Sequence, residues 1–267
     1  MEKHIILSLG RSGSNYLVTL LNAHPQVTNY GEVLGEWMLP YQLHHRFGLG
    51  GKSISSYLEY IYDSQLFFYL GQVYSAFSHT RKREKINFKL RSQVKTVGVK
   101  DFSINFRRRD AWSFLKDHED ILVINLYREN LLKRYISLEK MSQSGVVAIR
   151  DNEVKEAQSQ SKRIHLSPGK TLAKLEFFET ALAEHMGLVG DLAPDRVLNV
   201  RYEDLFENPD AQSFYRDQIF SFLHVDPMPI KSGHRKITSD ELSNVIENYE
   251  EVHSALSQTR FAQYLNS

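Results

Sequence analysis

The stretch that decides the fold lies near the start of the chain, residues 4–17, and reads HIILSLGRSGSNYL. Its first part is largely apolar and predicts a buried strand over 4–9. The turn that follows contains Gly10 and Gly13. A helix predicted over 14–23 opens with serine and asparagine, which are both common at helix N-termini. A strand that passes through a glycine-containing turn into a helix is typical of α/β proteins.

The rest of the chain continues this alternation of short apolar runs and longer helical patterns. Further strands are predicted over 95–100, 120–127 and 196–201, and helices over 54–78, 107–116, 129–142, 172–186, 211–223, 239–250 and 253–265. Alternating strands and helices favour a parallel sheet flanked by helices. The sequence therefore predicts an α/β fold with a small sheet and a high helix content.

Domain organisation is predicted to be simple, because no internal repeat and no linker divides the chain. We expect one domain over residues 1–267. Residues 142–168 are polar and include the low-complexity piece EAQSQS at 156–161. A segment with so few apolar residues buries little surface, so we expect a surface insertion, a lid or a long polar helix there.

Composition excludes several classes of function. The 267 residues carry 33 Lys+Arg against 32 Asp+Glu, a formal net charge of +1, and no cysteine. Near-neutral charge argues against nucleic acid as a partner. The absence of cysteine excludes disulfides, thiolate metal sites and cysteine nucleophiles. Without a signal-peptide pattern or a run of about 20 apolar residues, we expect a cytoplasmic protein with no transmembrane segment.

The glycine-containing turn has the features of an anion site. Backbone N–H groups at the start of a helix lack partners, and the helix dipole adds positive potential there. Gly10 and Gly13 allow close approach, Ser12 and Ser14 add hydroxyl donors, and Arg11 adds a fixed charge. A Walker loop would place a lysine after the last glycine, and none is present. An ordinary strand–helix turn remains the alternative interpretation.

Three short segments resemble the opening of sulfotransferases that use 3′-phosphoadenosine-5′-phosphosulfate (PAPS), above all the tyrosylprotein and bacterial carbohydrate or lipid types: RSGSNYL at 11–17, LLNAHP at 20–25 and GE at 31–32. The resemblance implies a P-loop-NTPase-like fold and PAPS as co-substrate, with adenosine 3′,5′-bisphosphate as product. It also implies that the 5′-phosphosulfate is held by Arg11, Ser12, Gly13, Ser14 and Asn15. Asn15 stands where the family usually has serine or threonine.

A second anion site is predicted beyond the third strand. Arg128 follows the apolar run 123–127, and Ser137 lies on the next predicted helix. The resemblance implies that this pair holds the 3′-phosphate, one adenylate length away from the first loop. The spacing is one residue longer than the commonest family spacing, which leaves the register open. The alternative is a surface helix with solvated Lys133 and Arg134.

Two later segments extend the resemblance. VRYEDL at 200–205 resembles a family segment whose tyrosine lies near the nucleotide, which implies that role for Tyr202. The basic run KSGHRK at 231–236 resembles a loop that folds over the nucleotide, with Lys236 as a phosphate contact. A tyrosine at a strand end and an exposed basic turn are the corresponding structural interpretations.

The resemblance also implies a catalytic set. A general base takes the proton of the acceptor, and Glu32 is the first candidate, with Glu36 and His24 as rivals. A lysine at a strand end, Lys100, corresponds to the family lysine that neutralises the bridging oxygen, and Arg11 stabilises charge on the leaving group. The structural alternatives are a helix-capping role for Glu32 and a carboxylate partner for Lys100.

The predicted function is in-line transfer of a sulfuryl group from PAPS to a hydroxyl of a carbohydrate, lipid or small-molecule acceptor, without a metal. Adjacent His44 and His45 point apart on any regular element and do not suggest a metal site. Aromatic residues within 57–77 and the polar insertion are expected to line or cover the acceptor site. The alternatives are a nucleotide kinase or NTPase with a degenerate phosphate loop, and a non-catalytic nucleotide-binding protein. A homodimer is compatible with the sequence.

Overall fold

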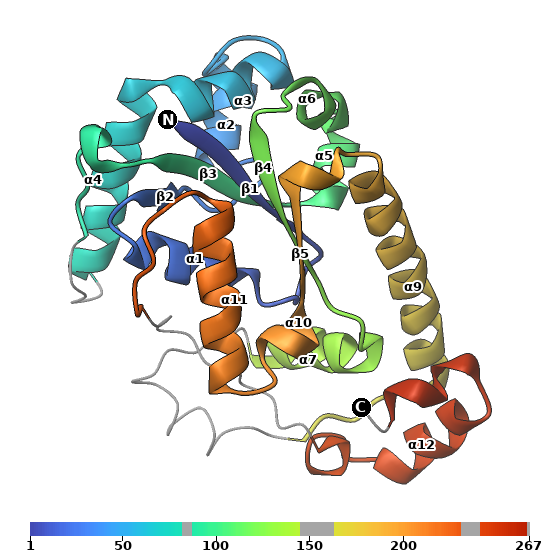
Figure 1. Ribbon diagram of the computed structural model, residues 1–267. Helices are drawn as coiled ribbons and strands as arrows, with labels where there is room; N and C mark the ends of the chain where they lie inside the picture. The colour runs from blue at the N-terminus through green and yellow to red at the C-terminus, as the bar shows by residue number, and fades with distance from the viewer. Residues whose placement is uncertain (82–86, 145–162, 231–240, 266–267) are drawn as a thin grey trace.

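Five parallel strands form one sheet in the order β2-β3-β1-β4-β5 (Figure 1). The computed structural model describes residues 1–81, 87–144, 163–230 and 241–265. The strands are β1 (Glu2–Ser8), β2 (Val27–Asn29), β3 (Thr96–Phe102), β4 (Ile121–Tyr127) and β5 (Val197–Arg201). Strand β1 lies in the middle of the sheet, and the glycine-containing loop connects it to helix α1. The predicted α/β fold with a small parallel sheet flanked by helices is confirmed.

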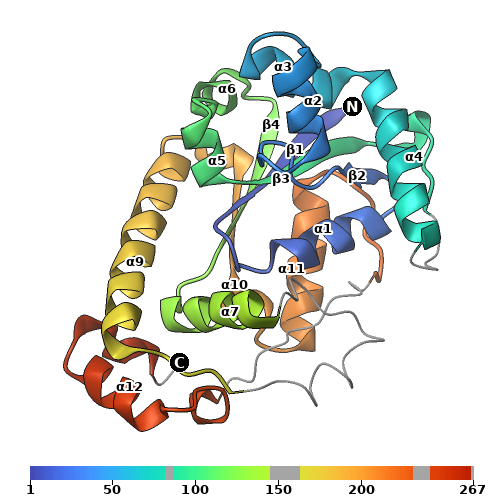
Figure 2. The ribbon, with the colours of Figure 1, turned by 180° about the vertical axis from the view of Figure 1, so that it is seen from behind.

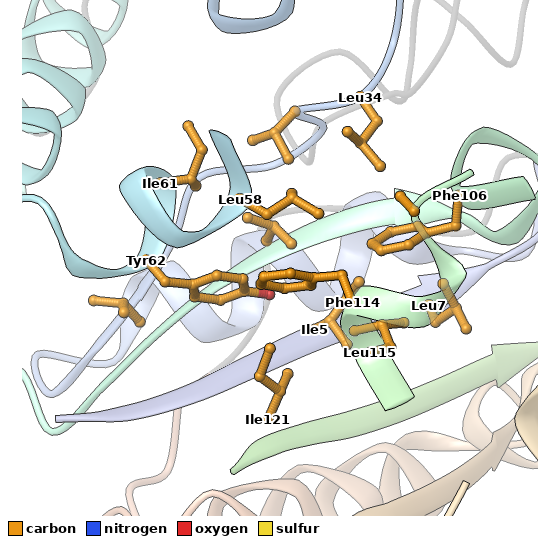
Figure 3. Packing of buried hydrophobic residues seen from close by; sticks show 14 of the residues in the cluster. Ile5, Leu7, Leu34, Leu58, Ile61, Tyr62, Phe106, Phe114, Leu115 and Ile121 are labelled. Atoms are coloured by element: carbon orange, nitrogen blue, oxygen red, sulfur yellow. The ribbon is translucent and has the colours of Figure 1, made fainter. Parts of the chain in front are cut away.

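Helices cover both faces of the sheet, and successive side chains of β1 point to opposite faces. Ile5 and Leu7 pack in a cluster with α2, α3, α4, α5 and α6, whereas Ile6 packs with α1, α10 and α11. Figure 3 shows Tyr62 and Phe114 among the residues over Ile5 and Leu7. These helices are α1 (Ser14–Ala23), α2 (Leu39–Phe47), α3 (Ile54–Asp63), α4 (Gln65–Arg81), α5 (Ser103–Arg108), α6 (Trp112–Asp117), α10 (Tyr202–Leu205) and α11 (Pro209–Phe222).

A third cluster lies at the end of the molecule where α7, α9 and α12 meet (Figure 2). These helices are α7 (Leu131–Ser144), α9 (Pro168–Gly190) and α12 (Tyr249–Ser257), and 3₁₀ turns lie at Arg91–Gln93, Pro194–Arg196, Leu242–Asn244 and Arg260–Tyr264. Arg134 of α7 lies with its guanidinium 4.1 Å over the ring of Phe178 on α9. This contact joins α7 to α9.

Several elements differ from the sequence prediction. Helices α5 and α6 replace the single helix expected over 107–116, because the chain turns at Asp110 with φ 52°. The helix expected over 54–78 is divided at Ser64, whose Oγ accepts the N–H of Phe67 and so starts α4. Strand β2 and helix α2 have no counterpart in the prediction. Within the described part of the chain, no helix is long and apolar enough to span a bilayer.

The segment predicted as a polar insertion, residues 142–168, is buried at its far end. Ile164 and Leu166 are almost completely buried in the cluster with α9 and α12, and Ile164 forms a β-bridge to Ile246. Pro168 then begins α9. Arg163, His165 and Ser167 are exposed, so residues 163–168 lie partly at the surface and partly in the core. Residues 145–162 lie outside the described residues, and the prediction of a single domain stays a prediction.

Candidate functional site

The loop between β1 and α1 turns sharply at two positions. Arg11 has φ 67° and Gly13 has φ 83°, both in the left-handed region. A Cβ atom at Gly13 would lie 2.9 Å from Phe206 Cε2 and 3.1 Å from the ring of Tyr202, so this position requires glycine. At Gly10 nothing lies within 4 Å of the same point. The second glycine is therefore essential to the loop and the first leaves open space beside it.

The start of helix α1 is left without a side-chain cap. Gly13 occupies the N-cap position and has no side chain that could accept a helix N–H group, and no acidic residue lies in the first turn. Ser14 is buried as the first residue of the helix, and Asn15 follows it half-buried. The buried hydroxyl of Ser12 donates to the carbonyl oxygen of Leu9 at 2.7 Å and so stabilises the loop itself. Uncapped N–H groups with a favourable dipole suit an anion.

Side chains from β4 and α7 meet this loop directly. Arg11 Nε donates to Ser137 Oγ at 3.0 Å, and Arg128 Nη1 lies 3.4 Å from the carbonyl oxygen of Arg11. The sequence predicts two anion sites separated by the length of an adenylate. In the structure the two groups are instead in contact, because α7 packs under the loop and Arg11 extends toward it. Arg11 thus has its backbone in the first predicted site and its guanidinium at the second.

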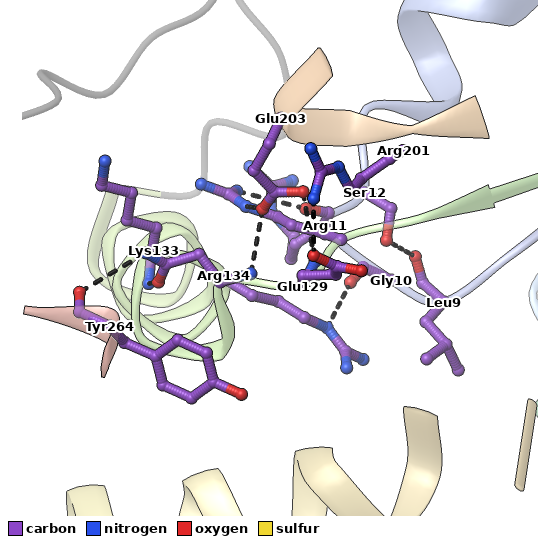
Figure 4. A network of polar contacts seen from close by, with 12 residues as sticks. Leu9, Gly10, Arg11, Ser12, Glu129, Lys133, Arg134, Arg201, Glu203 and Tyr264 are labelled. Atoms are coloured by element: carbon purple, nitrogen blue, oxygen red, sulfur yellow. Dashed lines mark hydrogen bonds and ion pairs between the residues drawn. The ribbon is translucent and has the colours of Figure 1, made fainter. Parts of the chain in front are cut away.

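A third arginine, Arg134, belongs to the same group. Its Nε donates to the carbonyl oxygen of Gly10 at 2.9 Å (Figure 4). The side chain is 7% exposed, and its buried Nη1 makes no hydrogen bond within the described residues. The sequence names Arg134 only in the alternative interpretation, as a solvated helix residue. Its position one helical turn before Leu138, on the apolar side of α7 with Leu131 and Tyr135, is the signal that could have placed it inward. We call Arg11, Arg128 and Arg134 the arginine cluster.

Like charges in the arginine cluster affect one another. Burial and then the nearby Arg128 lower the pKa of Arg11. The same two causes, in the same order, lower the pKa of Arg134 to about 10. Lowered pKa values in both groups mean that the protein destabilises their charged forms. An anion bound between them would reverse part of that effect.

Tyr202 and Glu203 complete the surroundings of Arg128. The Arg128 guanidinium lies 4.2 Å over the Tyr202 ring, which itself packs on Gly13. Glu203 Oε1 is 4.0 Å from Arg128 Nε and also accepts the N–H of Asn130 at 2.9 Å. Glu203 is therefore shared between Arg128 and the start of α7. The structure places Tyr202 beside the loop, and its role at a nucleotide stays a prediction.

Glu32 and Lys100 form an ion pair on the other side of β1. Lys100 Nζ donates to Glu32 Oε1, and the ammonium also lies 4.3 Å over the ring of Phe102. Lys100 is 3% exposed and Glu32 is 17% exposed in their side chains. The strand register sets Lys100 beside Ile6 of β1, close to where β1 enters the loop. The pair therefore lies at the carboxyl end of the sheet, where parallel α/β folds bind ligands.

Asp101 holds the segment that carries Glu32. Its buried carboxylate accepts the N–H groups of Val33 and Leu34 at 2.9 and 2.8 Å, and the side chain of Asn105 at 2.7 Å. Burial raises the pKa of Asp101, and these hydrogen bonds act against that rise. The structure therefore gives Asp101 a positioning role for Glu32.

The rival bases are engaged elsewhere. Glu36 is exposed and pairs with Arg109 at 2.8 Å. His24 is buried: its Nδ1 accepts the N–H of Gln26 at 3.1 Å, and its Nε2 lies 2.8 Å from the carbonyl oxygen of Asp226. Burial is the main cause that lowers the pKa of His24. Neither residue contacts Lys100 or the arginine cluster, so Glu32 is the best placed of the three.

Two other predictions have different outcomes. Lys236 lies outside the described residues. Of the aromatic residues expected at an acceptor site, Tyr57, Tyr62, Phe67 and Phe68 are buried in the core. They support α3 and α4 rather than line an opening. In the described part of the chain, no group of three or more His, Cys, Asp or Glu side chains could hold a metal ion.

The sequence matches no protein-family model and no curated protein. The structure is similar to a sulfotransferase from Alicyclobacillus acidocaldarius, with 12% identity, 99% of this chain and 95% of that chain covered, and a TM-score of 0.44. It is also similar to the sulfotransferase domain of the Synechococcus PCC 7002 olefin synthase, with 18% identity, coverage of 96% and 86%, and a TM-score of 0.40.

A third similar structure is the sulfotransferase domain from the curacin biosynthetic pathway. Its identity is 17%, 85% of this chain and 75% of that chain are covered, and the TM-score is 0.39. At this level of similarity the comparison does not by itself assign an activity to the chain. The activity has to be argued from the residues of the site.

Proposed function

We propose that this protein is a PAPS-dependent sulfotransferase that transfers a sulfuryl group to a hydroxyl of a carbohydrate, lipid or small-molecule acceptor. One observation carries the proposal: three arginine side chains meet at a glycine-containing loop that opens an uncapped helix. Positive charge from side chains, backbone N–H groups and the helix dipole is thereby directed at one place. A ligand with more than one phosphate fits this arrangement.

We assign the backbone N–H groups of residues 13–15 to the 5′-phosphosulfate and Arg128 with Ser137 to the 3′-phosphate. The two groups are in contact through Arg11, so this assignment requires Arg11 to move when the nucleotide binds. Arg134 offers Nη1, a buried donor that makes no hydrogen bond within the described residues. Guanidinium groups bind phosphate through parallel hydrogen bonds, which are stronger than neutral ones. The Arg11–Ser137 hydrogen bond would open when a phosphate takes its place.

The Glu32–Lys100 pair supplies the acid–base groups that transfer needs. PAPS, when bound, supplies the activated sulfuryl group. Glu32 would take the proton of the acceptor hydroxyl on Oε2, to which none of the described residues donates. Lys100 would turn from Glu32 Oε1 to the oxygen that gains charge on the leaving phosphate. The two residues are thus held side by side before reaction, in roles that need opposite charges.

The loop chemistry favours sulfuryl over phosphoryl transfer. A kinase or NTPase of this fold holds the terminal phosphates with a loop lysine and places a hydroxyl on magnesium. Here the loop carries arginine at position 11 and no lysine after Gly13, and the Ser12 hydroxyl is bonded to Leu9. Catalysis without a metal and a cytoplasmic location belong to the proposal as predictions.

The proposal is tested by incubating the protein with ³⁵S-labelled PAPS and a panel of sugar, lipid and phenolic acceptors in the presence of a chelator. We expect labelled product with at least one acceptor and stoichiometric adenosine 3′,5′-bisphosphate. The Glu32→Gln variant serves as the control for contaminating enzymes. Turnover of ATP with magnesium and none of PAPS would favour the kinase alternative. Tight binding of the bisphosphate without turnover of PAPS by any acceptor would favour the non-catalytic alternative.

A further inference from the structure

Helix α4 has an apolar face that nothing in the described chain covers. Its inner side packs on the sheet edge: Gly71 faces the ring of Tyr30, and the Gln72 side chain reaches Thr28. Large apolar side chains on its outer side remain exposed: Leu66 63%, Tyr69 39%, Leu70 54%, Val73 59%, Tyr74 66% and Phe77 69%. We call these six residues the α4 stripe. Their spacing of three and four residues places them on one side of the helix.

A helix that is apolar on both sides normally lies in a core or in a membrane. Helix α4 lies at the β2 edge of the sheet, away from β4 and β5 (Figures 1 and 2). It is also not long and apolar enough to span a bilayer. Scattered exposed apolar residues are normal on protein surfaces, but a contiguous patch of this kind marks an interaction site.

We infer that the α4 stripe is the interface of a homodimer, in which two copies of α4 pack against each other about a two-fold axis. A two-fold interface uses the same patch on both copies, so the patch has to complement itself. Residues 65–77 contain no Asp, Glu, Lys or Arg. Two copies therefore meet without like charges. In the antiparallel arrangement Leu66 of one protomer lies near Phe77 of its partner, with Leu70 and Val73 at the axis.

The exposed area agrees with a dimer. Six partly exposed large side chains present roughly 700 Å² per copy, when a fully exposed aromatic residue counts about 200 Å². A stable interface buries about 800 Å² per partner. Phe88 and Leu90, each about half exposed, lie on the segment after α4, where the N–H of Lys89 between them donates to Gln72 Oε1 at 3.2 Å. This inference is independent of the proposed enzymatic activity.

A membrane surface is the other partner that an apolar helix face suggests. Helices that lie on membranes carry lysine and arginine beside their apolar face to contact anionic lipids. No Lys or Arg lies among residues 65–77, which carry the stripe, and the basic run RKREK begins one helical turn later at Arg81. The stripe itself is therefore uncharged, as a self-complementary interface requires, and vesicle binding is the outcome that would assign it to a lipid surface.

Sedimentation velocity of the full chain tests the dimer. We expect twice the 31.0 kDa chain mass at micromolar concentration. The double variant Leu70→Glu/Tyr74→Glu places four carboxylates in the interface, and we expect its dimer dissociation constant to rise at least about 100-fold. Phe214→Glu is the matched control, because Phe214 is 58% exposed on α11, outside the stripe. This control should remain dimeric, and circular dichroism should show all three proteins folded.

A cysteine-free chain allows a second test. Val73→Cys introduces the sole thiol near the expected axis, and a short bismaleimide should join two copies through it. Phe214→Cys should not be joined under the same conditions. A wild-type monomer at high micromolar concentration, or equal masses for the double variant and wild type, would overturn the inference. So would a monomer that binds phosphatidylcholine–phosphatidylserine vesicles through the stripe.

Discussion

Two charged regions lie on either side of strand β1, and they balance their charge in opposite ways. The arginine cluster brings three guanidinium groups together, and burial with mutual repulsion lowers the pKa of Arg11 and Arg134. At the end of β3, Lys100 and Glu32 instead neutralise each other. An anion supplied from outside would stabilise the first region, whereas the second is already neutral as an ion pair. We therefore expect the arginine cluster to determine nucleotide affinity and the Glu32–Lys100 pair to determine the rate of transfer.

The largest expected effect on turnover comes from the Glu32–Lys100 ion pair. Glu32→Gln keeps the shape of the side chain and removes the proton acceptor, so turnover should fall by ~100-fold or more. Affinity for adenosine 3′,5′-bisphosphate should stay unchanged, because the change lies outside the arginine cluster. Steady-state turnover and calorimetric binding measure the two effects separately. Glu36→Gln is the control and should leave both unchanged, since Glu36 is exposed and paired with Arg109. Equal loss in both variants would remove Glu32 from its assigned role.

The next effect concerns the cluster itself. Arg128→Ala removes charge-assisted hydrogen bonds, which typically contribute about 1.5–3 kcal/mol, so bisphosphate affinity should fall by about 10- to 100-fold. Arg201→Ala is a nearby control: Arg201 is partly exposed and pairs with Glu129 at 3.0 Å and with Asp204. Affinity in that variant should change little. Similar losses in both would mean that general positive charge, rather than the cluster, attracts the nucleotide.

A matched pair of glycine variants examines the loop between the two regions. Gly13→Ala should lower the free energy of unfolding by about 1–2 kcal/mol from backbone conformation alone. Contact of the new methyl group with Phe206 and Tyr202 adds to that loss and displaces the ring on which Arg128 lies. Gly10→Ala meets nothing within 4 Å and should fold like wild type. Urea unfolding measures both. Equal stability of the two variants would contradict the described loop.

The smallest effect is a pH dependence next to the cluster. Burial, and then Arg134, lower the pKa of His185 to about 4 from an ordinary value of 6.5. The unfolded chain therefore binds a proton that the folded chain does not, and stability is lost as pH falls from 6.5 toward 4. At pH 5.5 this costs about 1 kcal/mol relative to pH 7.

Replacement of the histidine isolates that term. His185→Gln should lose less stability than wild type between pH 7 and pH 5.5, whatever its stability at pH 7. Urea unfolding at the two pH values gives the difference for each protein. Saturating bisphosphate should reduce the wild-type difference, because an anion near Arg134 offsets the positive charge that acts on His185. An identical pH dependence in both proteins would show that His185 is already solvated.

The main strands could be predicted because their pattern is local. Apolar runs identify β1, β3, β4 and β5 to within two residues of their observed ends. Strand β2 has three residues, too few for a periodic signal, and it exists because it pairs with β3. The break at Ser64 depends on one side-chain cap. Elements that depend on a neighbouring strand or on a single hydrogen bond cannot be predicted from the periodicity of apolar residues.

In the site, too, local features could be predicted from the sequence and contacts between distant segments could not. The loop residues are contiguous, so the glycines and Arg11 could be identified from sequence. Glu32 and Lys100 are far apart in the chain, and their ion pair follows from the path after β2 and the register of β3. Arg134 could not be told from a solvated residue, because its inward position depends on how α7 packs under the loop. Contacts between Arg11 and Ser137 likewise required the tertiary structure.

The most direct test compares two nucleotides that differ in one phosphate. Isothermal titration calorimetry of the wild-type chain with adenosine 3′,5′-bisphosphate and with adenosine 5′-monophosphate isolates the contribution of the 3′-phosphate. The arginine cluster predicts at least about tenfold tighter binding of the bisphosphate, equivalent to 1.4 kcal/mol, and a loss of that preference in Arg128→Ala. Equal affinities for the two nucleotides in wild type would contradict the assignment of the cluster to a 3′-phosphate.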